Sequence, residues 1–181
     1  MRVLEFLASI VFLLCTGVLS TNVSVPTAPA LEYMYTAFAD CKAGIFTAQT
    51  AKGLRTAIPI VGGNFTGPRL NGKILNLGAD WGLTDPQTGI FSADTRYNLQ
   101  TEDGANIYIQ TSGSIQPDKK LHLRLVFETG DKEYYWLNFV TAVGFLQPIV
   151  VYEDGSYTLR IDVWNLANEY KNTTFVNGTT Y

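Results

Sequence analysis

Short apolar runs separated by tight-turn residues constrain this chain more than any other feature. Asn71-Gly72, Asp103-Gly104 and Asp154-Gly155 each stand between two such runs. Asn-Gly and Asp-Gly adopt the positive φ that two-residue hairpin turns need, so each of these dipeptides indicates a β-hairpin. Gly62-Gly63 and the segment 129–131 are interpreted as further turns. The runs between the turns are predicted strands: 31–39, 56–61, 64–70, 74–77, 91–101, 105–111, 121–128, 135–143, 146–152 and 157–166.

Strict alternation within these runs indicates half-buried strands. In residues 121–128, three leucines and Phe127 share one face, while His122, Arg124, Val126 and Glu128 share the other. No long helical period follows residue 20. A meander of about 8–10 antiparallel strands that closes into a barrel would remove exposed edges, and this all-β fold is the one predicted. A two-sheet β-sandwich is the alternative.

The N-terminus has the plan of a secretory signal peptide. Arg2 is followed by an apolar stretch over residues 4–19 and by a plausible cleavage site at Val18-Leu19-Ser20. An uncleaved signal anchor is the alternative. We therefore expect a signal peptide at 1–20, an extended leader at 21–30, the barrel at 31–166 and a flexible glycosylated tail at 167–181.

Four Asn-x-Ser/Thr sequons agree with entry into the secretory pathway, at Asn22, Asn64, Asn172 and Asn177. The expected location is secreted or in the lumen of that pathway. Removal of Cys15 with the signal peptide leaves Cys41 as the one cysteine, so no internal disulfide is predicted. A buried, inert thiol is the expected state of Cys41.

Several function classes lack the residues they need. The formal net charge is -3 and no Lys/Arg cluster is present, which argues against nucleic acid as a partner. The segment from Gly67 to Lys73 resembles a phosphate-binding loop, but Ile74 occupies the place of the required Ser/Thr. With one histidine and no nucleophile elbow, neither a serine-hydrolase triad nor a zinc site is supplied. No cofactor, no metal and no stable membrane insertion are predicted; a homodimer is left open.

A set of motifs in fixed order carries a family resemblance. They are 58–73, Gly78-Ala-Asp-Trp81, Asp94-Thr-Arg-Tyr97, 101–108, and 127–131 with 135–138. In this order they resemble the domain of unknown function 3237 family over about residues 31–166. The resemblance implies a lipocalin-like barrel. The chain departs from the family pattern between Thr111 and Leu121, where the family usually carries a longer basic and helical insertion.

The resemblance also implies a function. Secreted fungal members look like pericyclic cyclases, including hetero-Diels–Alder catalysts that join a reactive intermediate of a tropolone or polyketide to a terpene alkene. The leading hypothesis is therefore a cofactor-free cyclase acting on a small hydrophobic intermediate of secondary metabolism. A non-catalytic secreted carrier and a cell-surface protein with a packed barrel are the alternatives.

Candidate site residues come from these motifs, and the sequence does not fix which strand faces look inward. Asp80, Tyr108 or Glu128 is the candidate acid that forms the reactive intermediate, and Arg96 or Asn138 the group that polarises its oxygen. Trp81 and Trp136 are expected to line the cavity, and His122 shares a face with Glu128. The structural alternatives are a turn cap for Asp80, a surface ion pair for Asp94 and Arg96, and solvated exterior positions for the other charged residues.

Overall fold

The computed structural model describes residues 24–167, 174 and 176–178. The predicted signal peptide and the sequons at Asn22 and Asn172 lie outside the described residues. Asn64 and Asn177 are exposed. In the described part of the chain, no helix is long and apolar enough to cross a membrane.

The described residues form ten strands and one short 3-10 helix. These are β1 (Leu31–Cys41), β2 (Phe46–Thr50), β3 (Gly53–Thr66), β4 (Asn71–Ile74), β5 (Gly78–Thr84), β6 (Phe91–Thr101), β7 (Asn106–Ile115), β8 (Leu121–Glu128), the 3-10 helix η1 (Tyr135–Phe139), β9 (Ala142–Val151) and β10 (Tyr157–Leu166).

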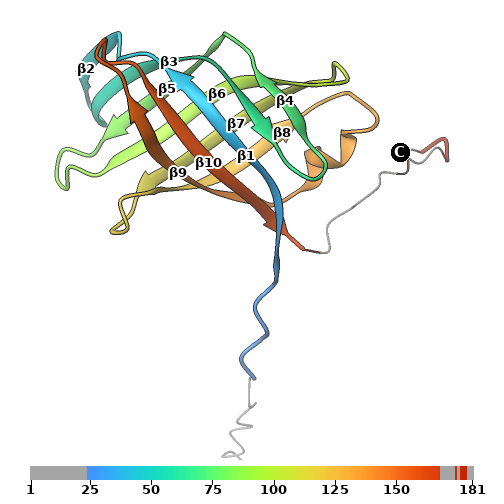
Figure 1. Ribbon diagram of the computed structural model, residues 1–181. Coiled ribbons are helices and arrows are strands. Elements are labelled where there is room, and N and C mark those ends of the chain that lie inside the picture. The colour runs from blue at the N-terminus through green and yellow to red at the C-terminus, as the bar shows by residue number, and fades with distance from the viewer. Residues whose placement is uncertain (1–23, 168–173, 175, 179–181) are drawn as a thin grey trace, which may run out of the picture.

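The strands close into an antiparallel barrel, as predicted (Figure 1). Eight of them form the ring in the order β1-β10-β9-β8-β7-β6-β5-β3, and pairing of β3 with β1 closes it. β2 extends β3 at one end, and β4 pairs with both β3 and β6 at the other. Closure satisfies the backbone groups that an open sheet would leave exposed.

Two predicted strands are one strand in the structure. β3 runs without a turn through Gly62-Gly63, where the sequence predicted a break. Gly63 has φ +129°, and a Cβ there would lie 2.0 Å from the Phe38 carbonyl oxygen. The register of β1 on β3 also shifts between Asp40 and Cys41. The glycines therefore form an irregularity within the strand, because only glycine tolerates this approach to β1.

The segment 135–143 is the clearest error of element type. Its first part is the 3-10 helix η1, and β9 begins only at Ala142. The Asn138 amide explains the turn: Oδ1 accepts the Thr129 N–H at 3.0 Å, and Nδ2 donates to the carbonyl oxygens of Thr129 and Tyr135. β2 and β5 were not predicted, and β5 proves to carry the site.

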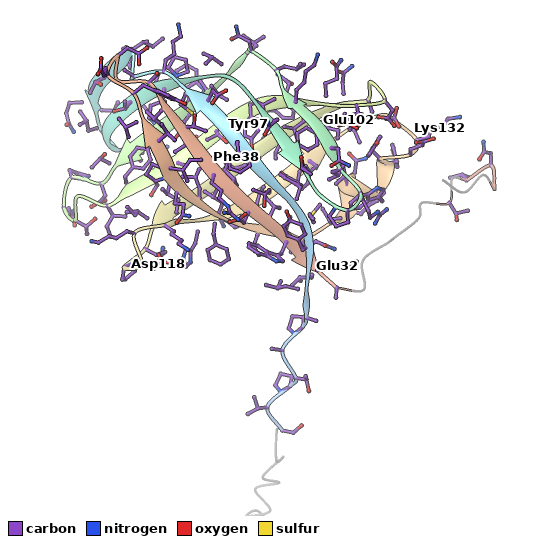
Figure 2. The ribbon with its side chains drawn as sticks, in the orientation of Figure 1. Glu32, Phe38, Tyr97, Glu102, Asp118 and Lys132 are labelled. Atoms are coloured by element: carbon purple, nitrogen blue, oxygen red, sulfur yellow. The ribbon has the colours of Figure 1, made fainter. Side chains whose placement is uncertain are left out.

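The two ends of the barrel differ. Near η1, Trp136 and Leu137 are buried and belong to the hydrophobic core, and we call this the closed end. The hairpins β5–β6, β7–β8 and β9–β10 lie at the opposite end of the barrel, which we call the open end (Figure 1). Figure 2 marks the open end by Asp118 and the closed end by Glu102.

Candidate functional site

The inner face of β5 carries a single side chain between two glycines. Gly78, Asp80 and Gly82 point into the barrel because they alternate with Ala79 and Trp81. A Cβ at Gly78 would lie 2.6 Å from Cβ of Tyr97, and one at Gly82 would lie 2.3 Å from the Phe91 ring. The two glycines thus leave room for one aromatic residue on each side of Asp80, Tyr97 at Gly78 and Phe91 at Gly82.

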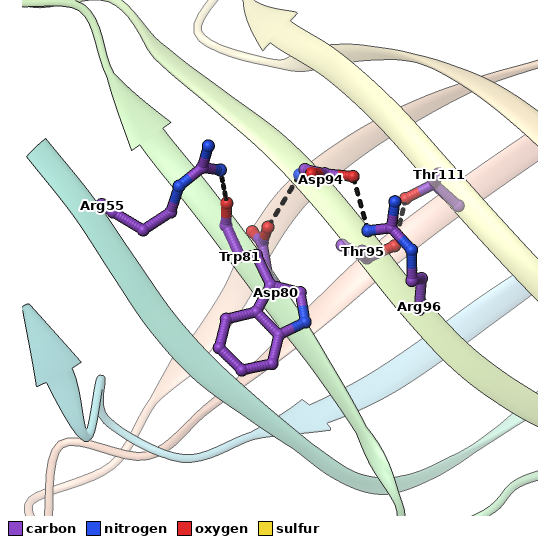
Figure 3. Close-up of polar contacts among 7 residues, drawn as sticks. All are labelled: Arg55, Asp80, Trp81, Asp94, Thr95, Arg96 and Thr111. Carbon is purple, nitrogen blue, oxygen red and sulfur yellow. Dashed lines mark hydrogen bonds and ion pairs between the residues drawn. The ribbon is translucent and has the colours of Figure 1, made fainter. Parts of the chain in front are cut away.

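The Asp80 carboxyl lies at a gap in the β5–β6 hydrogen-bond ladder, where it accepts a backbone hydrogen bond (Figure 3). Ala79 and Asp80 pair with Arg96 and Thr95, and the register resumes at Leu83 with Ser92. At the gap, the Asp94 N–H donates to Asp80 Oδ1 at 2.9 Å, and the Arg55 guanidinium donates to the Trp81 carbonyl oxygen. Backbone groups that would bond each other in a regular ladder are therefore satisfied by side chains.

Asp80 faces a small enclosed cavity in the half of the barrel nearer the open end. Its volume is about 30 Å³, room for one or two water-sized groups. The wall is mostly apolar, with a few hydroxyl groups and one thiol. The lining residues are Ala39, Cys41, Ile58, Ile60, Asp80, Thr95, Tyr97, Thr111, Leu146, Tyr157, Leu159 and Ile161.

Burial raises the pKa of Asp80 to about 6 from its ordinary value of 3.8. The hydrogen bond from the Asp94 N–H lowers this pKa, the Asp94 charge raises it, and the Arg55 charge lowers it. The desolvation of the carboxylate outweighs the two favourable contacts. A carboxyl that changes protonation near neutral pH is suited to general acid–base catalysis.

The other titratable groups of the cavity stay neutral at pH 7. Burial raises the pKa of the Cys41 thiol and of the Tyr157 hydroxyl to about 12 each, with nearby Asp80 adding to both shifts. Burial also raises the pKa of Tyr97, with a contribution from Cys41. The hydroxyls of Thr95 and Thr111 bond each other at 2.6 Å. Asp80 is therefore the one ionised group in this wall at neutral pH.

Of the predicted catalytic residues, Asp80 alone reaches the interior cavity. Arg96 lies on the outer face of β6, where its Nη1 pairs with Asp94 Oδ1 at 2.8 Å and both side chains are more than 40% exposed. This is the surface ion pair that the sequence left open. Arg96 cannot contact a ligand inside the barrel.

Tyr108, Glu128 and Asn138 come together on the outside, near the closed end. They line an open groove of about 520 Å³ with Asn98, Asn106, Ile107, Thr129, Gly130 and Tyr135. The Asn138 amide is fully occupied in holding the turn before η1. The groove is the larger hollow, but its carboxylate faces solvent and its wall is half polar, so the interior cavity is the better chemical site.

The predicted substrate-binding aromatics do not line the interior cavity. Trp81 is on the outer face of β5 and is 45% exposed, because its neighbour Asp80 takes the inward position. Trp136 is buried at the closed end, with the Arg69 guanidinium 3.7 Å from its ring centroid. His122 is on the outer face of β8, bonded to Asp118 at 2.9 Å and packed against Phe145.

Sequence reasoning missed Tyr97, Thr95, Thr111, Cys41 and Tyr157. The signal was present in β6, where Phe91, Ala93, Thr95, Tyr97, Leu99 and Thr101 share one face and the other carries Asp94, Arg96, Asn98 and Gln100. The more apolar face of a barrel strand points inward, and that rule would have placed Tyr97 inside and Arg96 outside.

The motifs that surround Asp80 fall within a known family. Residues 29–125 match the family model described as protein of unknown function (DUF3237). The chain belongs to this family. The crystal structure of a β-barrel-like protein from Acinetobacter baumannii AYE is 33% identical with a TM-score of 0.68, covering 78% of this chain and 98% of that one.

One relative of known activity comes from Penicillium herquei. Its hydroalkoxylation enzyme phnH is 31% identical over 121 residues, which is 67% of this chain and 76% of the relative. The crystal structure of an enzyme from the same organism is 27% identical with a TM-score of 0.63, covering 79% of this chain and 98% of that one. An enzyme among the relatives of this chain supports a catalytic role for the barrel.

The described residues offer no metal site. Among residues 24–167, 174 and 176–178, no group of three or more His, Cys, Asp or Glu side chains is placed to hold a metal ion. The chemistry available at the cavity is that of one carboxyl group and neutral hydroxyl and thiol groups.

Proposed function

We propose that this chain is a cofactor-free cyclase that adds a hydroxyl group of a hydrophobic natural-product intermediate across a carbon–carbon double bond. The observation that carries the proposal is the Asp80 carboxyl, half-buried against apolar walls with a pKa of about 6. The hydroalkoxylation activity of the P. herquei relative supports the reaction type, because hydroalkoxylation is the addition of an O–H group to an alkene.

Asp80 acts as a proton shuttle in this proposal. As carboxylate it takes the hydroxyl proton while the oxygen bonds to one alkene carbon, and as carboxylic acid it returns the proton to the other carbon. The product is an isomer of the substrate, so no oxidant, reductant or leaving group is needed. A pKa near the working pH allows both halves of the cycle, and the apolar wall orients the two reacting ends.

Substrate binding requires the open end to widen. Drug-sized ligands occupy pockets of about 300–1,000 Å³, whereas the closed cavity holds about 30 Å³. Tyr157 and Leu159 begin β10 beside the open end and line the cavity, so they are the side chains that must move. Exposed apolar residues surround this entrance, which suits a hydrophobic substrate: Ile45, Phe46, Ile90, Val151 and Tyr152.

The hetero-Diels–Alder reaction implied by the family resemblance uses the same site differently. There the wall would hold two alkene partners together, and orientation alone contributes about 7–11 kcal/mol in ideal intramolecular cases. Asp80 would only assist formation of the reactive partner. Dependence of the ring-closing step on Asp80 therefore separates hydroxyl addition from cycloaddition.

Turnover by purified protein tests the proposal. Protein is incubated in EDTA with hydroxy-alkene substrates and, separately, with diene–alkene pairs, and products are resolved on a chiral column. We expect faster ring closure of a hydroxy-alkene with one enantiomer in excess, unaffected by EDTA. Saturable binding without any change in rate or product ratio would indicate the carrier instead.

Exterior positions provide a second prediction. Arg96→Ala and Glu128→Gln are expected to change kcat/KM by less than about three-fold, because both side chains lie outside the barrel. Surface substitutions of this kind usually change the free energy of unfolding by about 0.5 kcal/mol or less. Steady-state kinetics of each folded variant measures this. A loss of a hundred-fold in either variant would place the chemistry on the outer face.

Secretion and glycosylation are part of the proposal as well. We expect a mature chain that begins near Thr21 and carries N-glycans, with Asn64 and Asn177 exposed for attachment. Intact mass before and after glycosidase treatment, with N-terminal sequencing, measures both. An N-terminus at Met1 or an unchanged mass would contradict this expectation.

A further inference from the structure

Tyr97 presents a buried hydroxyl group that has no partner within the described part of the chain. The residue, labelled in Figure 2, is 2% exposed, and its side chain lines the Asp80 cavity. Its hydroxyl oxygen makes no hydrogen bond with any described residue. A buried donor left unpaired costs about 1–3 kcal/mol, so such a group in a cavity wall is a place for an acceptor to bind.

The strand register places Tyr97 near Asp80 along one wall of the barrel. Asp80 is directly opposite Thr95, and Tyr97 is the next inward residue along β6. The ring of Tyr97 lies against Gly78, the next inward residue along β5. One wall of the cavity therefore carries Asp80 and, one inward position further toward the closed end, Tyr97, whose hydroxyl group is unpaired.

The neighbouring groups leave Tyr97 available. Thr95 and Thr111 are bonded to each other, and Asp80 Oδ1 accepts the Asp94 N–H. Burial keeps Tyr97 protonated at neutral pH by raising its pKa. Tyr35, deeper in the core and 1% exposed, has a second unpaired hydroxyl, and Tyr97 contributes to raising its pKa.

We propose that Tyr97 donates a hydrogen bond to a carbonyl oxygen of the substrate, so that the double bond attacked at this site is conjugated to a carbonyl group. This inference rests on the proposed function, since it names the substrate class for the same cavity. The ligand is an enone with a hydroxyl group in reach of its β-carbon.

The strength of the acid selects this class of alkene. A carboxylic acid with the acidity of Asp80 is far too weak to protonate an isolated alkene. Conjugation removes that need, because the nucleophilic oxygen attacks first. The hydroxyl proton passes to Asp80, the C–O bond forms at the β-carbon, and the alkene electrons move to the carbonyl oxygen, which Tyr97 stabilises as an enolate. Asp80 then protonates the α-carbon.

Infrared spectroscopy of a bound enone tests the inference without turnover. The probe is 2-cyclohexen-1-one labelled with 13C at the carbonyl, added to the parent protein, to Tyr97→Phe and to Tyr108→Phe, a matched change on the outer face. We expect a carbonyl band shifted to lower wavenumber on binding to the parent and to Tyr108→Phe. Tyr97→Phe is expected to lose the shift and to bind about five- to ten-fold more weakly.

The thermal stability of Tyr97→Phe tests separately whether the Tyr97 hydroxyl is unpaired. Because Tyr97→Phe removes an unpaired hydroxyl, its thermal midpoint should equal or exceed that of the parent; a marked decrease would show that the hydroxyl is already bonded. An unchanged carbonyl band in Tyr97→Phe, or no saturable binding to the parent, would also overturn the inference. A shifted band in a protein that cyclises nothing would instead contradict the proposed function alone.

Discussion

Asp80→Asn is expected to lower kcat for ring closure about 10²–10⁴-fold, the usual contribution of a positioned acid–base group. The amide has nearly the shape of the carboxyl and can still accept the Asp94 N–H, so the gap in the β5–β6 ladder should persist. Steady-state kinetics on the same substrate measures the loss. Asp94→Asn is the matched control, because Asp94 lies outside the barrel and pairs with Arg96.

The pH dependence of kcat/KM provides a second test of Asp80→Asn. If Asp80 acts first as a base, kcat/KM of the parent rises as pH increases through about 6, where the carboxyl ionises. The residual activity of Asp80→Asn should lack this limb. Full activity in the asparagine variant, with the limb retained, would remove Asp80 from the mechanism.

Stability should move in the opposite direction to activity. The pKa of Asp80 is raised in the folded state, so the folded chain binds more protons than the unfolded chain between about pH 4 and 6. Stability is therefore lost as pH rises through this window. A shift of about two pKa units corresponds to about 3 kcal/mol. Asp80→Asn should be more stable than the parent at pH 7.5, by up to that amount, and similar to it at pH 4 in urea unfolding.

Trp136→Ala is expected to destabilise the barrel by about 3–5 kcal/mol, the usual cost of truncating a buried tryptophan. Trp136 is 5% exposed, belongs to the core at the closed end and stacks under the Arg69 guanidinium. Urea unfolding followed by far-ultraviolet circular dichroism measures the change. Activity per folded molecule should fall much less, because Trp136 does not line the Asp80 cavity.

Trp81→Ala provides the contrast, with an expected loss of less than about 1 kcal/mol for a partly exposed surface position. Trp81 is adjacent to Asp80 in sequence but points out of the barrel. Equal destabilisation by both substitutions would contradict the assignment of Trp136 to the core and Trp81 to the surface. A change of stereoselectivity in folded Trp81→Ala would bring the outer face of β5 into the site.

The closed barrel was predictable because alternation and the hairpin turns at Asp103-Gly104 and Asp154-Gly155 are local signals. Asn71-Gly72, predicted as a third hairpin turn, instead begins β4. β8 shows the alternation well: its three leucines and Phe127 face the core, as the period of two requires. The family resemblance then agreed with a fold already indicated by the residues themselves.

β5 was missed because its inward positions are glycines. Gly78 suggested a turn before Asp80, yet Gly78 and Gly82 each make room for an aromatic residue of β6, Tyr97 and Phe91 respectively. Close packing between strands is a tertiary property that local propensity does not register. Asp80 was selected from its motif, but its partner was taken to be the neighbouring Trp81 and not the cross-strand Tyr97.

The direction of each side chain, into the barrel or out of it, was also not predicted from the sequence. Arg96, Tyr108 and Glu128 came from motifs, and motif position does not specify direction. The alternation of β6, β7 and β8 places all three outside, with Thr95, Tyr97 and Thr111 inside. The segment 135–143 failed for a different reason: its strand-like composition is overridden by the three hydrogen bonds of the Asn138 amide.

A crystal structure with the cyclised product bound tests the central claim most directly, since two hollows on this barrel compete as the site. The account predicts product inside the barrel, its new ether oxygen beside the Asp80 carboxyl, its carbonyl oxygen on the Tyr97 hydroxyl, and Tyr157 displaced at the open end. Product seated in the outer groove of Tyr108 and Glu128, with the Asp80 cavity closed as before, would contradict it.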